Sequence, residues 1–584
     1  MSDEIRPGSL SCLIAGAAFA VGLAVLAVRL KAVQVDSAAD YNYRGTQQAE
    51  RRILTSGVRG RILDRNGVAL ADNVSSVSVV LLAERFQRRT WTATAEEIRR
   101  EIDRVAATVG RPSTVTDAGI ARHLRQRLSC PLVVWKDLAP DELARFAERS
   151  DDFPGFALDE TVERVYPNGS LAAHLIGHVG RGRGESQAGD ARFNFFESEL
   201  RGRAGLESFY DSYLRGMSGE DRALVDSRGY AIRRWPVVAA KRGPDLRTTI
   251  DARLQAAVEE QLVGCRAACV VVDPRNGDVL AMASSPTFDL NGLVPVFTEA
   301  RRKELLDDPL KPLLNRAAGG SYAPGSTFKP ITALAALGEG LDAGEPYACT
   351  GTYEIGGMRI RCARTWGHGE TDLRAALRDS CNTYFCSLGV RIGTNALVRA
   401  ARAFGIGTRT GIDFVEDAPG VVPDGAWKQA KYGERWYPGD LAQMSMGQGM
   451  LLVSPLRMAL VAGALGTGRM MRPRLNLGLP EDGFDLPFPS AHLAIVREGM
   501  RLVVEKGSGK RAAEGVSVKV AGKTGTAEVG AGANRRKNTW FIGYAPAEDP
   551  ELAIALVVER GESGGSTAAP RVGAILRSRY GHVE

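Results

Sequence analysis

The sequence predicts an α/β protein. Its C-terminal half should be a sheet with a helical insertion, preceded by an α+β segment and one long apolar helix. Strand patterns at 268–283 and at 516–559 enclose a helical region from about 326 to 464. Strands, then helices, then strands is the order of a sheet that carries a helical insertion. Residues 31–240 mix short strand and helix patterns, and an uncharged run of 19 residues begins at Leu10.

The composition is that of an ordinary globular protein. The chain has 584 residues, of which 44% are hydrophobic and 24% charged. These values exclude a collagen-like, coiled-coil or disordered chain. At about 150 residues per domain, the length corresponds to roughly four structural units or two larger ones. The net charge is +7, but the 75 basic residues are scattered among 68 acids. We therefore expect a solvated surface and no basic patch for nucleic acid.

The uncharged run from Leu10 to Val28 predicts a single transmembrane anchor. A helix of this length, at 1.5 Å per residue, roughly matches a hydrocarbon core of about 30 Å. The alternatives are a cleaved signal peptide, which would have a shorter apolar core and a small-x-small site, and a buried core helix. We expect a short tail over 1–9 and the anchor over 10–30. The few charges that flank the run do not fix its orientation.

Within the next 200 residues, one strand and one helix stand out. Ser75–Leu82 is rich in Val and predicts a strand. Glu96–Val109 places Ile98 and Ile102 on one face, as an amphipathic helix requires. This half of the sequence offers no cluster of catalytic residue types.

A domain boundary is predicted between 240 and 245, where Pro236 and Gly243-Pro244 interrupt a basic stretch. We assign 31–240 to an N-terminal domain and 245–584 to a C-terminal domain. The texture of the sequence changes after this point, because longer apolar runs and clearer helix patterns begin.

The C-terminal half opens with a helix and a hairpin. Thr249–Gln261 has helical spacing, with Asp251 as its cap. Two apolar runs on either side of Asn276-Gly277 give a strong hairpin signal. After the helical region we expect three strands and a closing helix, over Val516–Val520, Thr539–Tyr544, Glu551–Glu559 and Arg571–Tyr580.

The eight cysteines include no CxxC pair, and no histidine lies near them at zinc spacing, which argues against a metal site. Cys349 and Cys362 flank Tyr353–Ile360, a predicted hairpin that turns at Gly356-Gly357. In an oxidising compartment these two cysteines could form a disulfide. The alternative is that all eight remain thiols.

Ser326-Thr327-Phe328-Lys329 lies where a Gly/Pro turn leads into an apolar helix pattern. Residues three apart on a helix share a face, so Ser326 and Lys329 are expected side by side. A desolvated lysine can take the proton of a serine, and the N-terminus of a helix stabilises negative charge. Ser-x-x-Lys alone is a weak signal, because a chain of this composition contains about one by chance.

Two further motifs follow. Ser380-Cys381-Asn382 lies at a break between helical stretches and could be a helix cap, or a proton-relaying hydroxyl beside a substrate-holding amide. Lys523-Thr524-Gly525-Thr526 comes after the predicted strand Val516–Val520. It is not a phosphate-binding loop, because that loop needs glycine where Ser517 stands. A strand-edge lysine with two threonine hydroxyls suits a carboxylate.

In this order, Ser-x-x-Lys, Ser-x-Asn and Lys-Thr-Gly are the signature of serine acyltransferases that react with penicillin. The chain resembles the class B penicillin-binding proteins, the monofunctional peptidoglycan D,D-transpeptidases, over nearly its whole length. Residues 59–67 resemble the first motif of the family's N-terminal pedestal, and 202–216 resemble the second. The resemblance implies the serine penicillin-recognising transpeptidase fold, an elongated α+β pedestal and one transmembrane helix, with no glycosyltransferase domain.

The resemblance also implies a role for each motif residue. Ser326 would attack the D-Ala-D-Ala carbonyl of a stem peptide, with Lys329 as base, and Ser380 would pass the proton to the leaving D-Ala nitrogen. Backbone N–H groups of Ser326 and Thr526 would form the oxyanion hole. An amine of a neighbouring stem peptide would then capture the acyl group, and a β-lactam would mimic the donor. No metal, nucleotide or flavin is implied. The implied substrate-binding residues are Asn382, Lys523, Thr524, Gly525 and Thr526.

Three further segments resemble the elongation type of the class, penicillin-binding protein 2, more than the septal type. They are residues 366–369, 436–440 and 447–449. Within the first, His368 is expected to be a structural loop histidine. The resemblance implies a single-pass protein of the cytoplasmic (inner) membrane with residues 31–584 on its outer side. It implies a SEDS-family glycan polymerase as partner and no nucleic acid.

Four other functions compete with this interpretation: the sequence argues against the first three and leaves the fourth open. A serine β-lactamase would share the motifs but would not need the N-terminal half. A membrane β-lactam sensor would carry several membrane spans and a cytoplasmic effector. An inactive scaffold would have lost a motif residue. A D,D-carboxypeptidase would use water in place of the acceptor amine, and the sequence does not show what excludes water.

Overall fold

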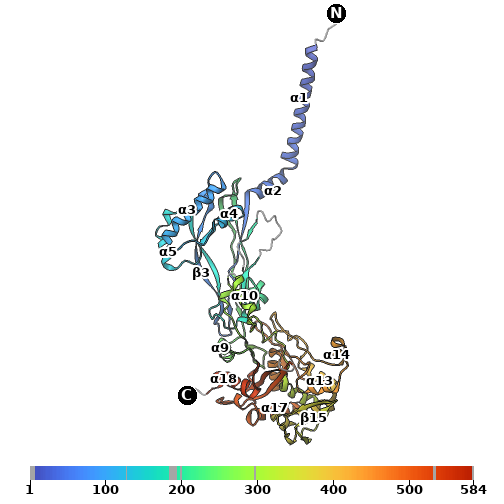
Figure 1. Cartoon of the computed structure of the whole chain (residues 1–584). Helices are drawn as coiled ribbons and strands as arrows, with labels where there is room; N and C mark the ends of the chain where they lie inside the picture. Colours follow the sequence, from blue (N-terminus) through green and yellow to red (C-terminus); the bar gives the residue numbers. More distant parts are fainter. Residues whose placement is uncertain are drawn as a thin grey trace.

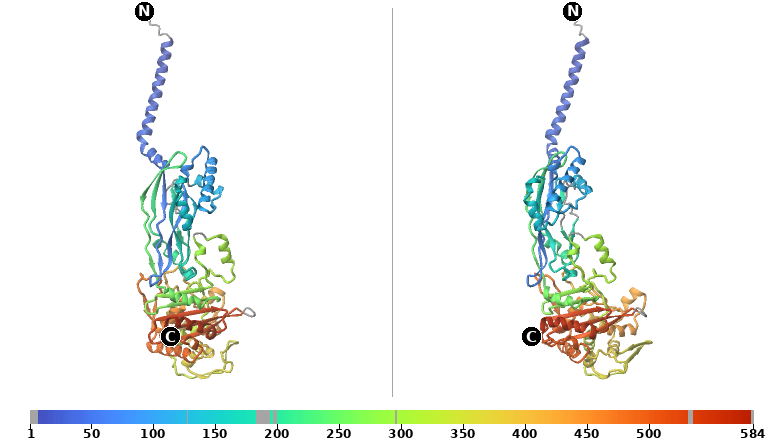
Figure 2. Two further views of the ribbon diagram at one scale, coloured as in Figure 1. Left: turned by 90° about the vertical axis from the view of Figure 1, so that its left-hand side faces the viewer. Right: turned by 60° about the vertical axis from the view of Figure 1, so that its left-hand side comes forward.

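The computed structural model describes residues 7–126, 128–182, 194–196, 200–294, 297–530 and 535–581. The expected tail over 1–9 therefore lies largely outside the described residues, as does the end of the expected C-terminal domain. The protein is long and narrow, with a lone helix at one end and a broad C-terminal part at the other (Figures 1 and 2).

The lone helix α1 (Pro7–Lys31) continues through a short π-helical turn (Ala32–Asp36) into α2 (Ala38–Ala49). Among the described residues it alone is long and apolar enough to cross a membrane. The span Leu10–Asp36 has a mean hydropathy of 2.4, and its apolar side chains are not covered by other parts of the protein. These properties match a single-pass membrane anchor.

The segment between α2 and the C-terminal sheet, called the pedestal from here on, is built on two larger sheets and the two-stranded sheet β6-β8. In the described residues, one of the larger sheets has the strand order β10-β9-β1-β7, and the other has β11-β2-β3-β4, with β5 also paired to β3. The longest ladder joins β3 and β5, antiparallel, from Asp72 opposite Val165 to Leu81 opposite Phe156. The strands are β1 Glu50–Thr55, β2 Ile62–Leu63, β3 Ala69–Leu81, β4 Leu132–Trp135, β5 Phe156–Val165, β6 Val179–Arg181, β7 Asn194–Phe196, β8 Leu200–Gly202, β9 Gly219–Val225, β10 Ala231–Val238 and β11 Leu246–Arg247.

Helices cover one side of the β3–β5 ladder, as the amphipathic pattern predicts. In α3, the side chains of Ile98, Ile102 and Val105 are fully buried, which confirms the predicted face. Burying a side chain of this size contributes about 1.5–3 kcal/mol. Thr90 caps the start of α3, and Gly110 ends it in a left-handed conformation. The pedestal helices are α3 Trp91–Val109, α4 Asp117–Gln126, α5 Pro140–Ala147, α6 Ala173–Ile176, α7 Gly205–Phe209 and α8 Asp211–Leu214.

A buried ion cluster joins the two pedestal motifs. The carboxylate of Glu207 accepts hydrogen bonds from Arg59 at 2.6 Å and from Arg164 at 2.7 Å. All three side chains are at most 4% exposed. Arg59 also donates to Asp211 at 2.7 Å. The cluster holds the segment before β2 against α7. Removal of one partner would leave a buried charge uncompensated, so the contact is costly to break.

The C-terminal domain is centred on an antiparallel sheet with the order β13-β12-β22-β21-β20. Side chains of β12 alternate between two cores: Val270 and Val272 face one, whereas Cys269 and Val271 face the other. Helices α9 and α18 cover the second face, and α16 with the helical insertion covers the first. The elements are α9 Ala252–Glu260, β12 Ala267–Val272, β13 Val279–Ser285, α16 Pro455–Thr467, α17 Ser490–Glu505, β20 Ala521–Val529, β21 Arg536–Ala545, β22 Leu552–Glu559 and α18 Ala569–Tyr580.

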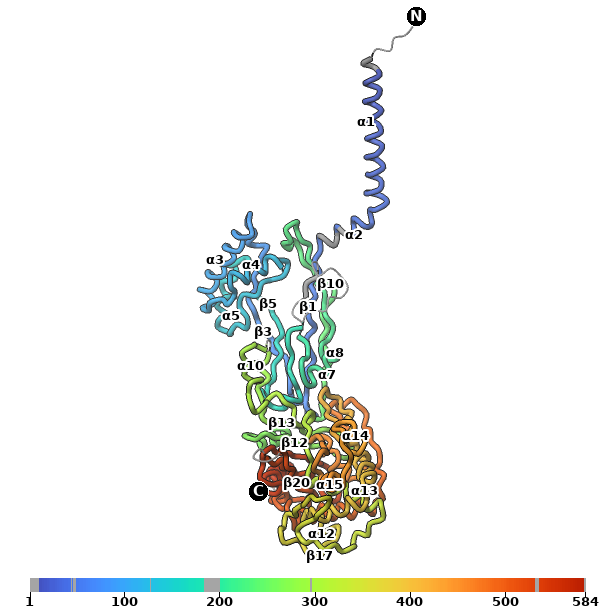
Figure 3. The backbone as a smooth tube through the Cα atoms, turned by 45° about the vertical axis from the view of Figure 1, so that its right-hand side comes forward, coloured from blue at the N-terminus to red at the C-terminus, as the bar shows by residue number. Residues whose placement is uncertain are grey.

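The helical insertion lies between β13 and α16; its helices α13 and α14 lie on the flank away from the C-terminus, whereas α10 lies toward the pedestal (Figure 3). It also contains two short two-stranded sheets, β14-β17 and β15-β16. Its elements are α10 Glu299–Asp307, a 3-10 turn Gly325–Phe328, α11 Lys329–Gly338, β14 Tyr347–Cys349, β15 Thr352–Ile355, β16 Met358–Arg361, β17 Gly369–Thr371, α12 Leu373–Arg378, α13 Asn382–Ala403, α14 Gly425–Tyr432 and α15 Pro438–Ser445.

Most predicted elements are present, and one is wrong. Asp251 caps α9, and the hairpins turning at Asn276-Gly277 and at Gly356-Gly357 both form. The predicted strand Val516–Val520 is a loop: Ser517 bonds to the carbonyl of Tyr580 at the end of α18 instead of joining a ladder. The strand begins directly afterwards as β20, so the Lys-Thr-Gly motif is part of the strand itself.

The pedestal and the C-terminal domain meet through specific polar contacts. Tyr210 Oη donates a 2.5 Å hydrogen bond to Asp413, whose carboxylate also accepts the N–H groups of Leu475 and Asn476. The short strand β11, which lies just after the predicted boundary, pairs with β2 of the pedestal. The two parts are therefore in contact at more than one place, which ties them together.

Candidate active site

The first motif sits on a tight turn that faces β20. Ser326 belongs to the 3-10 turn Gly325–Phe328, and α11 begins at Lys329. Gly325 has φ +57°, and a Cβ there would lie 2.8 Å from the carbonyl oxygen of Thr526. A Cβ on Gly525 would lie 2.9 Å from the carbonyl oxygen of Pro324. Both glycines are therefore needed for the serine turn to approach the strand this closely.

The second motif lies in the break between α12 and α13. Ser380 has φ +56°, a left-handed conformation that costs a residue with a side chain about 1–3 kcal/mol. Asn382 is the first residue of α13, and Cys381 between them is fully buried. Strain of this kind persists only where the surroundings hold it, and it aims the Ser380 hydroxyl at the two motif lysines.

Lys329 is fully buried and makes three hydrogen bonds to the second motif. Its Nζ lies 2.7 Å from the carbonyl oxygen of Ser380, 3.3 Å from Ser380 Oγ and 2.8 Å from Asn382 Oδ1. Among the described residues these are its hydrogen-bond partners, and a direct bond to Ser326 is not one of them. Burial lowers the pKa of Lys329 to about 8. Near neutral pH this amine can therefore release and accept a proton.

Lys523 approaches the same hydroxyl from β20. Its Nζ donates to Ser380 Oγ at 2.9 Å and to the carbonyl oxygen of Thr524 at 3.0 Å. Burial, and then the positive charge of Lys329, hold the pKa of Lys523 well below its usual value. Ser380 thus bridges the two lysines, as expected for a group that relays protons.

The threonines of the third motif have partners that the sequence does not predict. The Thr524 hydroxyl is hydrogen-bonded to Ser508, in the turn after α17. Thr526 Oγ1 accepts the N–H of Gly564, and its carbonyl oxygen accepts Gln448 Nε2 at 3.1 Å. Thr526 is only partly buried, so its hydroxyl borders the open side of the site. These contacts fix the edge of β20 that faces Ser326.

The fold therefore gathers the three motifs, which are spread over 200 residues, around one point. Ser326 comes from the 3-10 turn before α11, Ser380 and Asn382 from the α12–α13 break, and Lys523 from β20. One amide N–H of Asn382 is donated to the carbonyl oxygen of Arg361 at 3.1 Å. The arrangement offers a hydroxyl nucleophile, a buried amine, a second hydroxyl and a cation, which is the equipment of acyl transfer.

Four further residues form a cluster behind the second motif. Ligand atoms of Cys349, Cys362, His368 and Cys381 all lie within 4.8 Å of one another. His368 Nδ1 is 3.4 Å from Cys349 Sγ and 3.3 Å from Cys362 Sγ, and the sulfurs of Cys362 and Cys381 are 3.7 Å apart. Cys349 and Cys362 are not joined as a disulfide. The sequence argument against a metal site considered only spacing along the chain, so it does not address a cluster whose four residues come from separate segments.

The donor set and the spacing of this cluster fit a zinc ion. Three sulfurs and one imidazole nitrogen are a common structural zinc set. With Zn–S bonds of about 2.3 Å, sulfur ligands of a tetrahedral site lie about 3.8 Å apart, close to the separation of Cys362 and Cys381. The hydrogen bond with Cys381 lowers the pKa of Cys362 below its usual value, so this sulfur is the one poised as a thiolate. Cys381 connects the cluster directly to Ser380 and Asn382.

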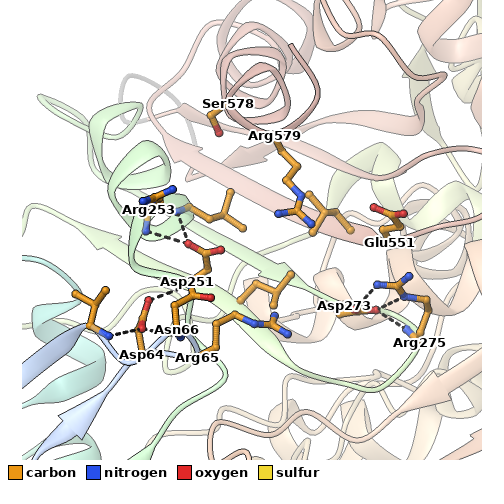
Figure 4. Close-up of a pocket in the computed structure, with 14 residues that line it drawn as sticks. Asp64, Arg65, Asn66, Asp251, Arg253, Asp273, Arg275, Glu551, Ser578 and Arg579 are labelled. Carbon is orange, nitrogen blue, oxygen red and sulfur yellow. Dashed lines mark hydrogen bonds and ion pairs between the residues drawn. The ribbon is translucent and has the colours of Figure 1, made fainter. Parts of the chain in front are cut away.

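A separate cavity lies away from this site. A cavity of about 830 Å³ lies between the Asp64–Val68 turn of the pedestal, the start of α9 and the end of α18 (Figure 4). Four carboxylates and four guanidinium groups line it, and Asp273 forms an ion pair with Arg275. None of its lining residues belongs to the three motifs.

Two family models match the chain. Residues 267–577 match the penicillin binding protein transpeptidase domain, and residues 54–248 match the penicillin-binding protein dimerisation domain. The first covers the C-terminal sheet and the three motifs, and the second covers most of the pedestal.

Individual relatives agree with these matches. The chain is 30% identical to the peptidoglycan D,D-transpeptidase MrdA of Escherichia coli K12, covering 96% of this chain and 91% of that protein. Its structure is similar to penicillin-binding protein 2 of Helicobacter pylori in complex with MreC, with a TM-score of 0.78, 26% identity and coverage of 91% and 98%. It is also similar to a chain of a peptidoglycan synthase complex that coordinates polymerization and crosslinking, with a TM-score of 0.73, 27% identity and 99% of each chain covered. The chain belongs to the class B penicillin-binding proteins and is a penicillin-binding peptidoglycan D,D-transpeptidase related to MrdA and penicillin-binding protein 2.

Proposed function

We propose that Ser326 is the nucleophile of this transpeptidase and that neutral Lys329 is the base that activates it. The serine oxygen attacks the carbonyl of the penultimate D-Ala of a donor stem peptide, and Lys329 takes the serine proton. The oxyanion that forms lies between the backbone N–H groups of Ser326 and Thr526, and each such donor contributes about 100 to 1,000-fold in rate. The closeness of the Gly325 turn to β20 supports this placement.

Collapse of the tetrahedral intermediate releases D-Ala and leaves an ester on Ser326. The departing nitrogen needs a proton, which Ser380 supplies and recovers from Lys329, because its hydroxyl lies within 3.3 Å of that ammonium. An amine of a neighbouring stem peptide then attacks the ester and completes the cross-link. A β-lactam would follow the first half of this path and stop at the ester.

The remaining motif residues bind the donor. Thr524 and Thr526 hold its terminal carboxylate, and Lys523 adds the positive potential that this anion requires. Gly525 keeps β20 free of a side chain beside the serine turn. Asn382 uses the amide N–H that does not reach Arg361 to hold the donor amide, while its oxygen orients Lys329 at 2.8 Å.

We also propose that Cys349, Cys362, His368 and Cys381 hold a structural zinc ion. A four-ligand protein site is closed, so the metal would supply cross-linking rather than a place for substrate. The cluster residues hold the strained turn at Ser380 in place. Cys381 follows Ser380 directly, and the backbone N–H of Asn382 donates to Cys362 Sγ at 3.3 Å. His368 is then a ligand as well as a loop residue.

The cellular setting that we propose follows from the substrate and the relatives. Residues 31–240 act as the pedestal and 245–584 as the catalytic domain, on the outer side of the cytoplasmic membrane, where stem peptides are cross-linked. The elongation role, with a SEDS-family glycan polymerase as membrane partner, is supported by the similarity to MrdA proteins and to a chain of a complex that coordinates polymerization and crosslinking.

The observation that carries these roles is the convergence of Lys329 and Lys523 on Ser380 beside the serine turn. The test is the intact mass of the full chain in detergent after incubation with benzylpenicillin, with Ser326→Ala beside it. A stable adduct of one penicillin on the natural chain, absent from the variant, supports the assignment. Rapid gain and loss of the adduct would indicate a hydrolase. No adduct on folded protein would contradict Ser326 as the nucleophile.

A further inference from the structure

A surface on α14, remote from the catalytic serine, combines exposed aromatic rings with unpaired cations. We call it the α14 patch and define it as Trp427, Lys431, Tyr432, Arg435 and Tyr437. The side chain of Tyr432 is 53% exposed and that of Tyr437 43%, whereas Trp427 is half-buried. Trp427 and Tyr432 meet edge to face, with ring centroids 5.8 Å apart. Aromatic rings at a surface offer large, rigid contact area at a low cost in side-chain entropy.

The cations of the patch lie over its rings. Lys431 Nζ is 4.9 Å from the Trp427 ring and 5.6 Å from the Tyr432 ring, and the guanidinium of Arg435 is 4.9 Å from the Tyr437 ring. Neither cation forms an ion pair with any residue in the described part of the chain. Their charge is therefore available to an anionic ligand that reaches the rings.

The patch is held rigid from below. Lys428 is buried and bridges Asp440, at 2.7 Å, and Glu434, at 3.3 Å, and its Nζ lies 4.8 Å from the Tyr437 ring. Asp424 caps the start of α14. A surface that is already ordered loses little entropy on binding, which is the condition for useful affinity from a few contacts.

A short helix links the patch to the active site. Tyr437 caps α15, whose eight residues span about 12 Å at 1.5 Å per residue. Beyond α15, the N–H of Gly325 donates to the carbonyl oxygen of Gly447, and Gln448 reaches Thr526. The α14 and α15 helices lie on the same flank of the domain, opposite the C-terminus (Figure 3). A polymer bound to the patch is thus within reach of the serine turn.

We propose that the α14 patch binds the glycan strand of the peptidoglycan substrate, an inference that rests on the proposed function. The faces of sugar rings present C–H groups that pack on aromatic side chains, and the stem peptides carry carboxylates that suit Lys431 and Arg435. The catalytic pocket itself contacts only a peptide end. Binding of a remote, non-reacting part of the substrate supplies the energy that positions the reacting part.

The experiment measures the affinity of the full chain in detergent for soluble, uncross-linked peptidoglycan strands. Parallel titrations use the same strands without stem peptides and the stem peptide without sugar. The variants are Tyr432→Ala, Lys431→Ala and the double variant Trp427→Ala/Tyr432→Ala. Trp91→Ala, which removes an exposed aromatic ring of the pedestal, is the matched control. The rate of acylation by benzylpenicillin is recorded for every variant.

We expect the double variant to bind strands about tenfold more weakly, with or without stem peptides. Lys431→Ala should weaken only the binding of strands that carry stem peptides. Trp91→Ala, the binding of free stem peptide and the acylation rate should stay within about twofold. Unchanged strand affinity in Tyr432→Ala and in the double variant would overturn the inference. If the double variant also loses acylation, its binding result is set aside, and the strand affinities of Tyr432→Ala and Lys431→Ala test the inference. A natural chain that binds strands but is not acylated would contradict the proposed function alone.

Discussion

Lys523 Nζ lies 2.9 Å from Ser380 Oγ, and Lys329 Nζ lies 3.3 Å from the same oxygen. Both amines are removed from water, which lowers both pKa values, and the positive charge of Lys329 lowers the pKa of Lys523 further. The site therefore favours states in which one lysine is neutral. This is the electrostatic basis on which a serine hydroxyl can be activated without a histidine.

The rate of acylation should depend on pH through Lys329. Only the neutral amine can take the serine proton, and burial lowers the pKa of this group to about 8. Below pH 8 the second-order rate constant for benzylpenicillin should therefore fall about tenfold per pH unit, and above pH 8 it should level off. The measurement is stopped-flow acylation from pH 6 to 10. Lys329→Arg, which stays protonated throughout, should lower the rate by at least about 100-fold. A flat profile in the natural chain would exclude Lys329 as the base.

Removal of the proposed zinc ion should slow acylation by loosening the turn at Ser380. The full chain should contain about one zinc ion by elemental analysis, and cobalt substituted for it should give the charge-transfer absorption of bound thiolates. A strong chelator should lower both the acylation rate and the thermal midpoint, because Cys381 would lose its anchor. His368→Ala should reproduce both effects. Cys386→Ser is the control, since Cys386 is equally buried but outside the cluster. A chain that lacks zinc yet acylates at full rate would refute the proposal.

The contact between Tyr210 and Asp413 should stabilise the junction between the pedestal and the catalytic domain. Tyr210→Phe removes one hydrogen bond to a charged group, which contributes about 1.5–3 kcal/mol. Hydrogen exchange should become faster at the N–H groups of Leu475 and Asn476, which share Asp413 with the tyrosine. Tyr213→Phe, three residues further along the chain in α8 and half-exposed, should leave exchange unchanged. Equal exchange in the two variants would show that the contact carries no such energy.

Glu207→Gln should be among the most damaging substitutions in the pedestal. It leaves the buried guanidinium groups of Arg59 and Arg164 without their carboxylate, at a cost of about 3–5 kcal/mol in the free energy of unfolding. Limited proteolysis should cleave the pedestal of this variant at lower temperature than that of the natural chain. Glu97→Gln breaks only ion pairs of exposed arginines and should behave like the natural chain. The idea fails if both variants resist proteolysis equally.

Features whose signal is local in the sequence could be predicted. The buried face of α3 follows from the spacing of Ile98 and Ile102, and the hairpin at Gly356-Gly357 follows from two glycines between alternating residues. The proximity of Lys329, Ser380 and Lys523 could also be predicted, because their motifs are specific as a set. The order of the motifs does not predict that Lys329 donates its hydrogen bond to Asn382 and not to Ser326.

Features that depend on contacts between distant segments could not be predicted. The metal-type cluster needs His368 to fold back between Cys349 and Cys362, and Glu207 meets Arg59 across 148 positions. The false strand at Val516–Val520 has a similar origin. Its alternating pattern is that of a strand, but its residues pack against the end of α18, so the ladder begins only at Ala521.

The length of the pedestal sets the distance between the membrane helix α1 and the C-terminal domain. Its longest strand, β3, has 13 residues and so spans about 43 Å at about 3.3 Å per residue. With α1 held in the bilayer, the ion cluster around Glu207 and the contact at Tyr210 keep this length from bending freely. If the proposed function holds, we expect this length to set the height of Ser326 above the membrane surface. A longer or shorter β3 would change the distance from the membrane at which stem peptides are cross-linked.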